Sequence, residues 1–228
     1  NLTMDTSGRA LVSSNSDGSH DEYELSDLYV IVDRRPTENY NQHWVVAFTT
    51  GATSSDTLRY ALYFDTDHAA GIGGDSDPRG NSTIVTDALY RPEYVIYVDK
   101  TNDMETSAQY YNWLGNSWAP GQDLGDIGGF IEFDPVRQSL QILLPYTALG
   151  SADTHWVGSL ALAVYSIEAT SDIVHDTLPM QGVTLTNPAF VTNLLLPLYP
   201  FDTPLSNPLI YDDMPPLRWR MPAYGADG

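Results

Sequence analysis

The sequence is 228 residues long and 42% hydrophobic, contains no cysteine, and carries a formal net charge of −20 from 30 acidic and 10 basic residues. This charge disfavours binding to nucleic acid or to an anionic membrane surface, and leaves cations, neutral polymers and other proteins as partners. Without cysteine the chain forms neither disulfides nor thiolate metal sites, and it has no run of about 18 apolar residues that would predict a transmembrane segment.

The N-terminal region and two glycosylation sequons indicate whether the chain is part of a longer, extracellular protein. Residues 1–20 are rich in Ser, Asn, Asp and Gly without sustained periodicity, which predicts an N-terminal lead-in. The chain begins at Asn1 without a methionine, which predicts a processed or truncated piece of a longer protein. Asn1 and Asn81 each open an Asn-X-Ser/Thr sequon, so both are candidate glycosylation sites of an extracellular or cell-surface protein.

Residues 21–178 carry the pattern of a β domain. Eight short segments are rich in β-branched and aromatic residues and are bounded by Gly, Pro, Asn or Asp, as strands are. These segments are 23–33, 43–50, 58–65, 93–99, 108–113, 128–134, 139–145 and 159–167. Helical periodicity is not convincing anywhere, and residues 146–150 form at most one helical turn. The sequence therefore predicts an all-β fold, an antiparallel, jelly-roll-like β-sandwich.

Proline changes the character of the chain after Leu178. Seven prolines lie between residues 188 and 216 and disfavour sustained sheet or helix, so residues 179–213 are expected to form an extended connector. Its apolar stretch FVTNLLLPLYPF is costly to leave in water, and we expect the connector to pack along the sandwich. Residues 214–228 weakly resemble the start of a fibronectin type III-like module, in which a proline precedes an LxW strand.

The order of several motifs within residues 21–178 is similar to that of DOMON-like β-sandwiches, the group that includes carbohydrate-binding module family 9. The motifs are LYFDTD (62–67), PEYVIYVD (92–99), YYNWLGNSW (110–118), GGFIEFD (128–134) and LQILLPYTALG (140–150). The most specific are the DTD that closes a strand ahead of a Gly-containing loop and the LPYTALG turn. The resemblance implies a module that binds sugars, as most such domains do, or else haem or calcium.

An aspartate-rich loop follows the strand predicted at 58–65. Asp65, Asp67, Asp75 and Asp77 are spread among three glycines. Asp65 and Asp67 emerge on one side of the strand end, where two carboxylates repel unless a cation neutralises them. Calcium takes about six to eight oxygen ligands, and the loop can turn Asp75 or Asp77 back onto it. The spacing is not that of an EF-hand, and a solvated turn capped by the aspartates is the alternative.

Aromatic residues surround a Leu-Gly-Asn turn at 114–116. Tyr111, Trp113 and Trp118 are candidate ligand-binding residues, because the C–H face of a sugar stacks on aromatic rings while Asn and Asp accept its hydroxyls. Strand alternation sends Tyr111 and Trp113 to one face and Tyr110 to the other, so at least one set is expected in the core. The alternative interpretation is an ordinary aromatic hairpin.

Other cofactors and catalytic motifs find little support in the sequence. The five histidines show neither an HExxH motif nor a paired metal spacing. A haem pocket would need an axial pair such as Met104 or Met180 with a histidine, and no spacing selects one. The sequence contains no nucleophile-elbow, phosphate-loop or dinucleotide motif, so we do not expect an enzyme.

The sequence thus favours a non-catalytic, calcium-stabilised binding module of a larger surface protein, with a polysaccharide or glycan as partner. The alternative is a structural subunit of a surface layer or filament, whose partners are copies of itself. An exposed aromatic strip would indicate the first function, and apolar strand edges and a connector buried against neighbouring copies would indicate the second. A haem-binding DOMON domain is a further alternative.

Calcium binding is tested against magnesium, because any divalent cation screens an acidic surface. Calcium at about 10 mM exceeds the dissociation constants of about 10⁻⁴ to 10⁻³ M that are typical of extracellular sites. We predict that it raises the melting temperature more than equal magnesium, and that the Asp65→Asn, Asp67→Asn double variant abolishes the difference. Equal responses of the unmodified chain to the two ions would show that the loop is a polar turn.

Overall fold

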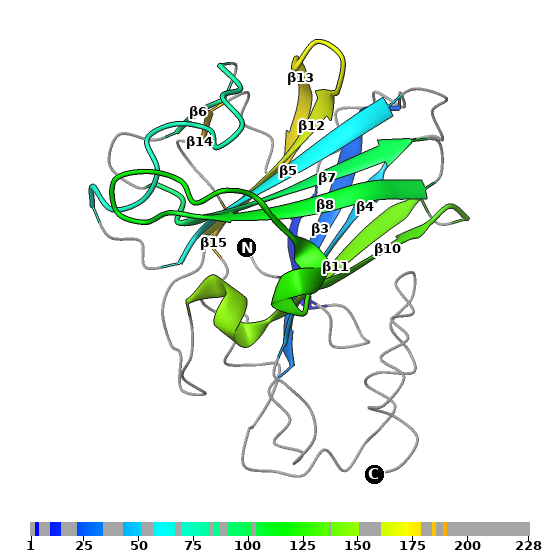
Figure 1. Cartoon of the computed structure of the whole chain (residues 1–228). Helices are drawn as coiled ribbons and strands as arrows, with labels where there is room; N and C mark the ends of the chain where they lie inside the picture. The colour runs from blue at the N-terminus through cyan, green and yellow to red at the C-terminus, as the bar shows by residue number, and fades with distance from the viewer. Residues whose placement is uncertain are drawn as a thin grey trace, which may run out of the picture.

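The fold comes from a computed structural model that describes residues 3–4, 10–14, 22–33, 43–51, 57–66, 70–82, 84–86, 91–101, 104–136, 138–150, 161–178, 184–185 and 189–190. These residues form two large β-sheets that pack face to face (Figure 1). Within the same ranges no helix is long and apolar enough to cross a membrane. The predicted all-β sandwich is confirmed.

Sheet A has the strand order β1-β2-β3-β4-β11-β10, and every neighbouring pair is antiparallel. Its strands are β1 (Thr3–Met4), β2 (Ala10–Ser14), β3 (Leu25–Asp33), β4 (His43–Thr50), β10 (Phe130–Asp134) and β11 (Ser139–Pro145). The pairing of β2 with β3 was not predicted, because residues 1–20 lack a periodic pattern. Part of the predicted lead-in therefore extends the sheet.

Sheet B has the order β13-β12-β5-β7-β8-β9 and is also antiparallel. Its strands are β5 (Thr57–Asp65), β7 (Tyr94–Thr101), β8 (Met104–Asn112), β9 (Gln122–Asp123), β12 (Ala161–Glu168) and β13 (Val174–Leu178). β12 and β13 form the yellow hairpin at the top of Figure 1. The sequence did not predict β13, since VHDTL mixes polar and apolar residues without strict alternation.

The eight predicted strands correspond to β3, β4, β5, β7, β8, β10, β11 and β12, and their ends agree to within four residues. The helical elements of the described residues are two 3₁₀ turns, η1 (Leu124–Ile127) and η2 (Tyr146–Leu149). η2 is the single turn allowed by the sequence after Pro145. Gly150 ends it with a φ of 72°, a left-handed conformation that glycine adopts without steric cost.

Apolar side chains from both sheets fill the space between them. The even-numbered residues of β5 from Leu58 to Phe64 belong to this inner cluster, and Trp44 of β4 and Leu140 of β11 join it from sheet A. Full burial of one such side chain contributes about 1.5–3 kcal/mol. The alternation that predicted the strands is therefore the alternation that builds the core.

The outer face of sheet B is buried as well. An outer cluster on this face consists of Ala61, Tyr63, Ile84, Val95, Tyr97, Tyr111, Ala163, Tyr165 and Ile167. Ile84 comes from the segment between β5 and β7, which also contains the loop 70–82 and β6 (Val85–Thr86). Because both faces of the sheet are covered, β5 and β7 are nearly continuous apolar runs rather than alternating ones.

The Pro-rich connector contains two short paired strands, and one of them joins a sheet of the sandwich. β14 (Thr184–Leu185) runs parallel to β6, and β15 (Ala189–Phe190) runs antiparallel to β12. β13 pairs with the second half of β12, and β15 pairs with its first two residues. At Ala189 and Phe190 the connector pairs with sheet B, whereas β14 and β6 form a separate two-stranded sheet. Packing of the whole connector along the sandwich stays a prediction. The rest of its apolar stretch and residues 214–228 lie outside the described residues.

The pairing of β15 with β12 predicts a crosslink that the cysteine-free chain makes easy to detect. Ala161 and Phe190 are Cα partners, and antiparallel partners lie about 4.5–5.5 Å apart, within the range of disulfides. In the Ala161→Cys, Phe190→Cys variant we expect an intrachain disulfide that raises the melting temperature relative to the reduced form. Thiol titration and non-reducing electrophoresis measure it, with each single variant as control. Crosslinked dimers, or thiols that stay free, would contradict pairing within one chain.

Candidate functional site

The carboxylate of Asp77 ties the loop 70–82 to sheet B. Tyr63 of β5 and Tyr97 of β7 are diagonal neighbours on the outer face, because Tyr63 pairs with the residue two positions before Tyr97. Both hydroxyls donate to Asp77 Oδ2 at 2.5 Å. The backbone N–H groups of Arg79 and Asn81 donate to Asp77 Oδ1, each at 2.8 Å. These four donors match the acceptor capacity of a carboxylate, about four lone-pair positions.

The protonation states suit this arrangement. Burial raises the pKa of Tyr63 well above its ordinary value, and Tyr97 and the charge of Asp77 raise it further. Burial also raises the pKa of Tyr97, and Asp77 adds to the effect. Both phenols therefore stay protonated and act as donors. Asp77 is only 6% exposed, and these donors replace the water that a buried carboxylate loses.

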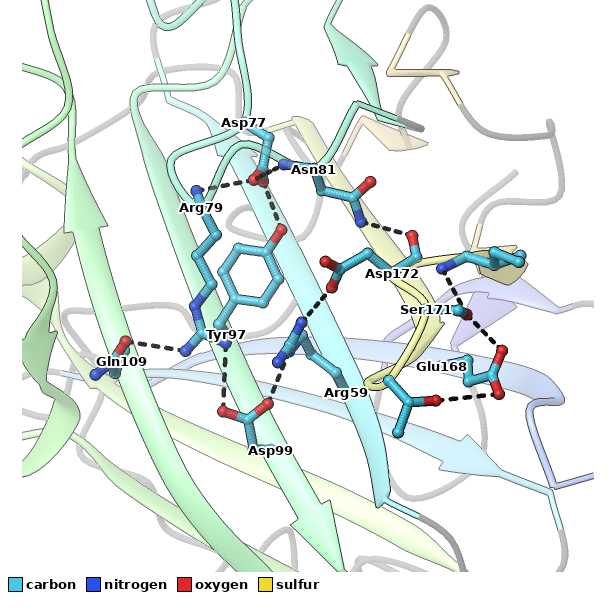
Figure 2. Close-up of polar contacts among 12 residues, drawn as sticks. Arg59, Asp77, Arg79, Asn81, Tyr97, Asp99, Gln109, Glu168, Ser171 and Asp172 are labelled. Carbon is cyan, nitrogen blue, oxygen red and sulfur yellow. Dashed lines mark hydrogen bonds and ion pairs between the residues drawn. The ribbon is translucent and has the colours of Figure 1, made fainter.

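Arg79 extends the network across the sheet (Figure 2). Its guanidinium carbon lies 4.3 Å from the centre of the Tyr97 ring, a cation–π geometry. Arg79 Nη2 donates to Gln109 Oε1 at 2.9 Å, and Nη1 donates to Asp99 Oδ2 at 3.3 Å. Its Nε donates to Tyr111 Oη at 3.1 Å. Arg79 therefore joins the loop to β7 and β8.

A second arginine, Arg59 of β5, binds the same carboxylate as Arg79. Arg59 Nε donates to Asp99 Oδ1 at 2.7 Å, and Nη1 donates to Asp172 Oδ1 at 2.5 Å. Asp172 lies in the turn between β12 and β13, and its main-chain oxygen accepts from Asn81 Nδ2 at 3.0 Å. The network therefore links the loop to β5, β7, β8 and the β12–β13 turn (Figure 2).

Asp99 is ionised between the two arginines. Burial opposes its ionisation, but the hydrogen bond from Arg59 and the charges of Arg79 and Arg59 outweigh burial, so the pKa of Asp99 lies below its ordinary value. For Arg59, burial lowers the pKa, whereas Asp99 and Asp172 raise it, and the net shift is upward. The side chains of Arg59 and Asp99 are 19% and 18% exposed, so salt screens this ion pair less than a surface pair.

A tryptophan hairpin stands beside the loop. Trp113 and Trp118 form an antiparallel bridge that closes the turn after β8, and Gly115 supplies the positive φ of 95° at its tip. The two indole rings meet edge to face, with centroids 5.3 Å apart. Trp118 Nε1 donates to the main-chain oxygen of Ser76 at 2.7 Å, and its ring lies so close to Gly74 that a Cβ there would overlap it. Trp118 thus joins the hairpin to the loop.

The two tryptophans differ in their surroundings. Both indoles are half-buried, but Trp118 packs against the outer cluster, whereas Trp113 belongs to neither cluster in the described part of the chain. Leu114, next to it, is 61% exposed, and Ile72 of the loop is 49% exposed. All four side chains lie at the end of sheet B where β5 and β8 end. This end therefore presents a partly open indole with apolar neighbours.

Tyr111, the third predicted ligand-binding residue, is buried. Its ring meets Tyr97 edge to face, its hydroxyl donates to Gln109 Oε1 at 2.7 Å, and Gly121 packs against it. Tyr110 belongs to the inner cluster and Tyr111 to the outer one, so the expected alternation is confirmed. Because both faces of sheet B are covered here, Tyr111 presents no open ring to a ligand.

The four predicted calcium ligands have different surroundings. Asp65, at the end of β5, is buried, Asp75 is exposed, and Asp77 is satisfied by the protein donors described above. Asp67 lies outside the described residues. Within the ranges that the structure covers, no three His, Asp or Glu side chains are grouped as metal ligands. Calcium binding by these four aspartates stays a prediction, and in the structure the protein contacts of Asp77 hold the loop.

The predicted glycosylation sites stay predictions as well. Asn1 lies outside the described residues. Asn81 is 7% exposed, and its Nδ2 donates to the main-chain oxygen of Asp172. Attachment of a glycan to Nδ2 in the folded chain therefore requires the side chain to leave this position.

Sequence reasoning missed the arginine network. Arg59 and Asp99 are register partners in β5 and β7, so knowledge of the strand pairing would have revealed them. The contact between Arg79 and Asp99 joins a loop to a strand, and such a contact leaves no periodic signal in the sequence.

No family model and no curated protein matches this chain. The resemblance to DOMON-like sandwiches stays a prediction, and function is inferred from the site alone.

Removing the charge of Asp99 tests the arginine network. Because its folded pKa lies below the unfolded value, ionised Asp99 stabilises the fold at neutral pH, and this contribution is lost as the pH falls through the folded pKa. We predict that Asp99→Asn lowers the free energy of unfolding at pH 7 by about 1–3 kcal/mol, and that the difference narrows below about pH 4. Urea unfolding across pH measures both, with exposed Asp75→Asn as control. A loss that does not depend on pH would contradict the prediction.

Proposed function

We propose that this chain is a non-catalytic glycan-binding module whose ligand surface is the end of sheet B formed by residues 70–77 and 113–118. The observation that carries the proposal is the contrast between the two tryptophans. Both indoles are half-buried, but Trp118 is fixed by Ser76 and Gly74, whereas Trp113 lies outside both clusters of the described residues and is supported by the ring of Trp118. An indole ring that is supported by its neighbour and is partly exposed is the kind of platform on which a sugar ring stacks.

Polar groups around the tryptophans supply hydrogen-bonding partners. Asn116 and Ser117 at the hairpin tip are exposed, as are Asp75 and Ser76 in the loop. Their amide, hydroxyl and carboxylate groups suit the hydroxyls of a sugar, which both donate and accept. The combination of one aromatic platform with several small polar side chains is typical of sites for uncharged, polar ligands.

Charge narrows the class of glycan. The net charge of −20 repels polyanions at long range, and neither residues 70–77 nor residues 112–121 contain Lys or Arg. Neutral polysaccharides are therefore favoured over uronate-rich or sulfated ones. The proposal includes an extracellular setting, which the two sequons support. It also includes calcium at Asp65 and Asp67, which the close spacing of their carboxylates supports.

A second candidate function is a structural subunit of a surface layer or filament. It is favoured by apolar side chains exposed at opposite ends of sheet B, Leu114 after β8 and Ile173 after β12. Contact between unlike ends of neighbouring copies generates an open filament when the rotation between copies does not close a ring. The net charge opposes such association at low ionic strength, which is why we prefer glycan binding. Growth of particle size with protein concentration in light scattering would favour the filament.

The proposal is tested with Trp113→Ala, using affinity electrophoresis in gels that contain xylan, hydroxyethylcellulose or glycol chitin. We expect Trp113→Ala to weaken retention by about tenfold or more, as for loss of an aromatic hot spot, and to leave the melting temperature nearly unchanged. Trp118→Ala should instead lower the free energy of unfolding by about 1–3 kcal/mol, because it removes packing and a hydrogen bond.

Ile173→Ala is the matched control, since it removes an exposed apolar side chain at the opposite end of sheet B, away from the proposed ligand surface. Its retention should stay close to that of the unmodified chain. If Trp113→Ala lowers the free energy of unfolding as much as Trp118→Ala does, the aromatic pair is core. If the unmodified chain is retained by none of these polymers or by a wider glycan array, the proposal fails.

A further inference from the structure

We infer that Asp77 is a positioning residue for the tryptophan pair: hydrogen bonds from Tyr63 and Tyr97 in the centre of sheet B hold, through Asp77, the loop that seats Trp118. We call this series of contacts, from the two tyrosines through Asp77 to Trp118, the relay. Its importance for ligand binding rests on the proposed function, whereas its effect on the geometry of the tryptophans is independent of that function. In the described part of the chain Asp77 itself makes no hydrogen bond with either tryptophan.

The first step of the relay joins Asp77 to the tryptophans. Ser76, its neighbour in the chain, accepts the indole N–H of Trp118 at 2.7 Å. Two residues earlier, Gly74 lies against the ring of Trp118, and its N–H donates to the main-chain oxygen of Pro92 at 2.8 Å. A displacement of Asp77 therefore moves the backbone that both hydrogen-bonds and packs against Trp118, and Trp118 in turn supports Trp113.

The second step joins Asp77 to the rigid part of the fold. Tyr63 is fully buried and Tyr97 is 1% exposed. The ring of Tyr63 meets Tyr165 edge to face, and the ring of Tyr97 meets Tyr111 in the same way. Packing of this kind fixes the directions of the two hydroxyls. They therefore form a fixed pair of donors toward which the carboxylate of Asp77 is drawn.

The third step concerns the loop itself. Gly71, Gly73 and Gly80 have positive φ angles, so the loop is rich in residues that lose much conformational freedom when they are ordered. Side-chain bonds must offset this cost. Asp77 makes four of them, two to the sheet and two that close its own turn at Arg79 and Asn81. Removal of the two tyrosine hydroxyls frees the loop from the sheet at this point while its internal turn remains.

The relay is tested by removing single hydroxyl groups. Tyr63→Phe, Tyr97→Phe and the double variant keep the buried rings and delete the donors to Asp77. Tyr165→Phe is the matched control: Tyr165 lies on the same face against Tyr63, and its buried hydroxyl has no hydrogen-bond partner in the described part of the chain. Asp77→Asn is included, and the phenylalanine variants decide the outcome if it does not fold.

Two measurements are made on each folded variant. The first is the exciton couplet that two indole rings in contact give in the far-ultraviolet circular dichroism spectrum, recorded well below the melting temperature so that a loss of stability alone does not change it. The second is retention by the polymers xylan, hydroxyethylcellulose and glycol chitin. We expect the double variant to lose most of the couplet and to bind roughly two- to thirtyfold more weakly. Tyr165→Phe should keep both.

The outcomes separate the relay from the proposed function. An unchanged couplet in the double variant, or an equal change in Tyr165→Phe, would overturn the relay. If the unmodified chain binds no polymer but the couplet is lost in the double variant only, the relay stands and the proposed function fails. If the couplet is lost while retention is unchanged, the relay positions the tryptophans without governing ligand binding, and its link to function is overturned.

Discussion

The buried carboxylate of Asp77 is the constraint on which the outer face of sheet B depends. Removing a carboxylate from water is costly, and here two tyrosine hydroxyls and two backbone N–H groups replace the lost hydration. The donors come from β5, from β7 and from the loop, so one group fixes both the turn of the loop and its place on the sheet. Ile84, which follows this loop in the chain, belongs to the outer cluster.

The chain has only 10 basic residues. In the described part of the chain, Arg59, Arg79 and Lys100 make their contacts within the fold. Arg59 and Arg79 share Asp99, and the single lysine, Lys100, is 1% exposed with its Nζ 4.2 Å from the centre of the Phe133 ring. Arginine suits the shared position because its planar guanidinium presents several donors in fixed directions. The surface is left strongly acidic, which fits a ligand without negative charge.

The tryptophan hairpin combines two half-buried indoles that are held by different contacts. Trp118 is held by the loop and by the outer cluster, and it leaves its partner Trp113 half-buried at the end of the sheet. A binding group is most precise when its supports are themselves fixed by packing and hydrogen bonds. Here the supports lead back to the tyrosines of β5 and β7, so the geometry of the exposed end depends on the buried centre.

The sequence by itself determined the eight main strands and the sandwich class, because alternation and turn residues act over a few positions and mark these strands locally. It also singled out the aspartate-rich loop and the aromatic turn. Only the tertiary structure decided what these residues do. Asp77 is satisfied by tyrosines 14 and 20 positions away, on two strands whose pairing sets the distance between their hydroxyls. Alternation assigned Tyr111 and Trp113 to one face, but whether a ring on that face is open depends on the loop that covers it, and that contact has no period in the sequence.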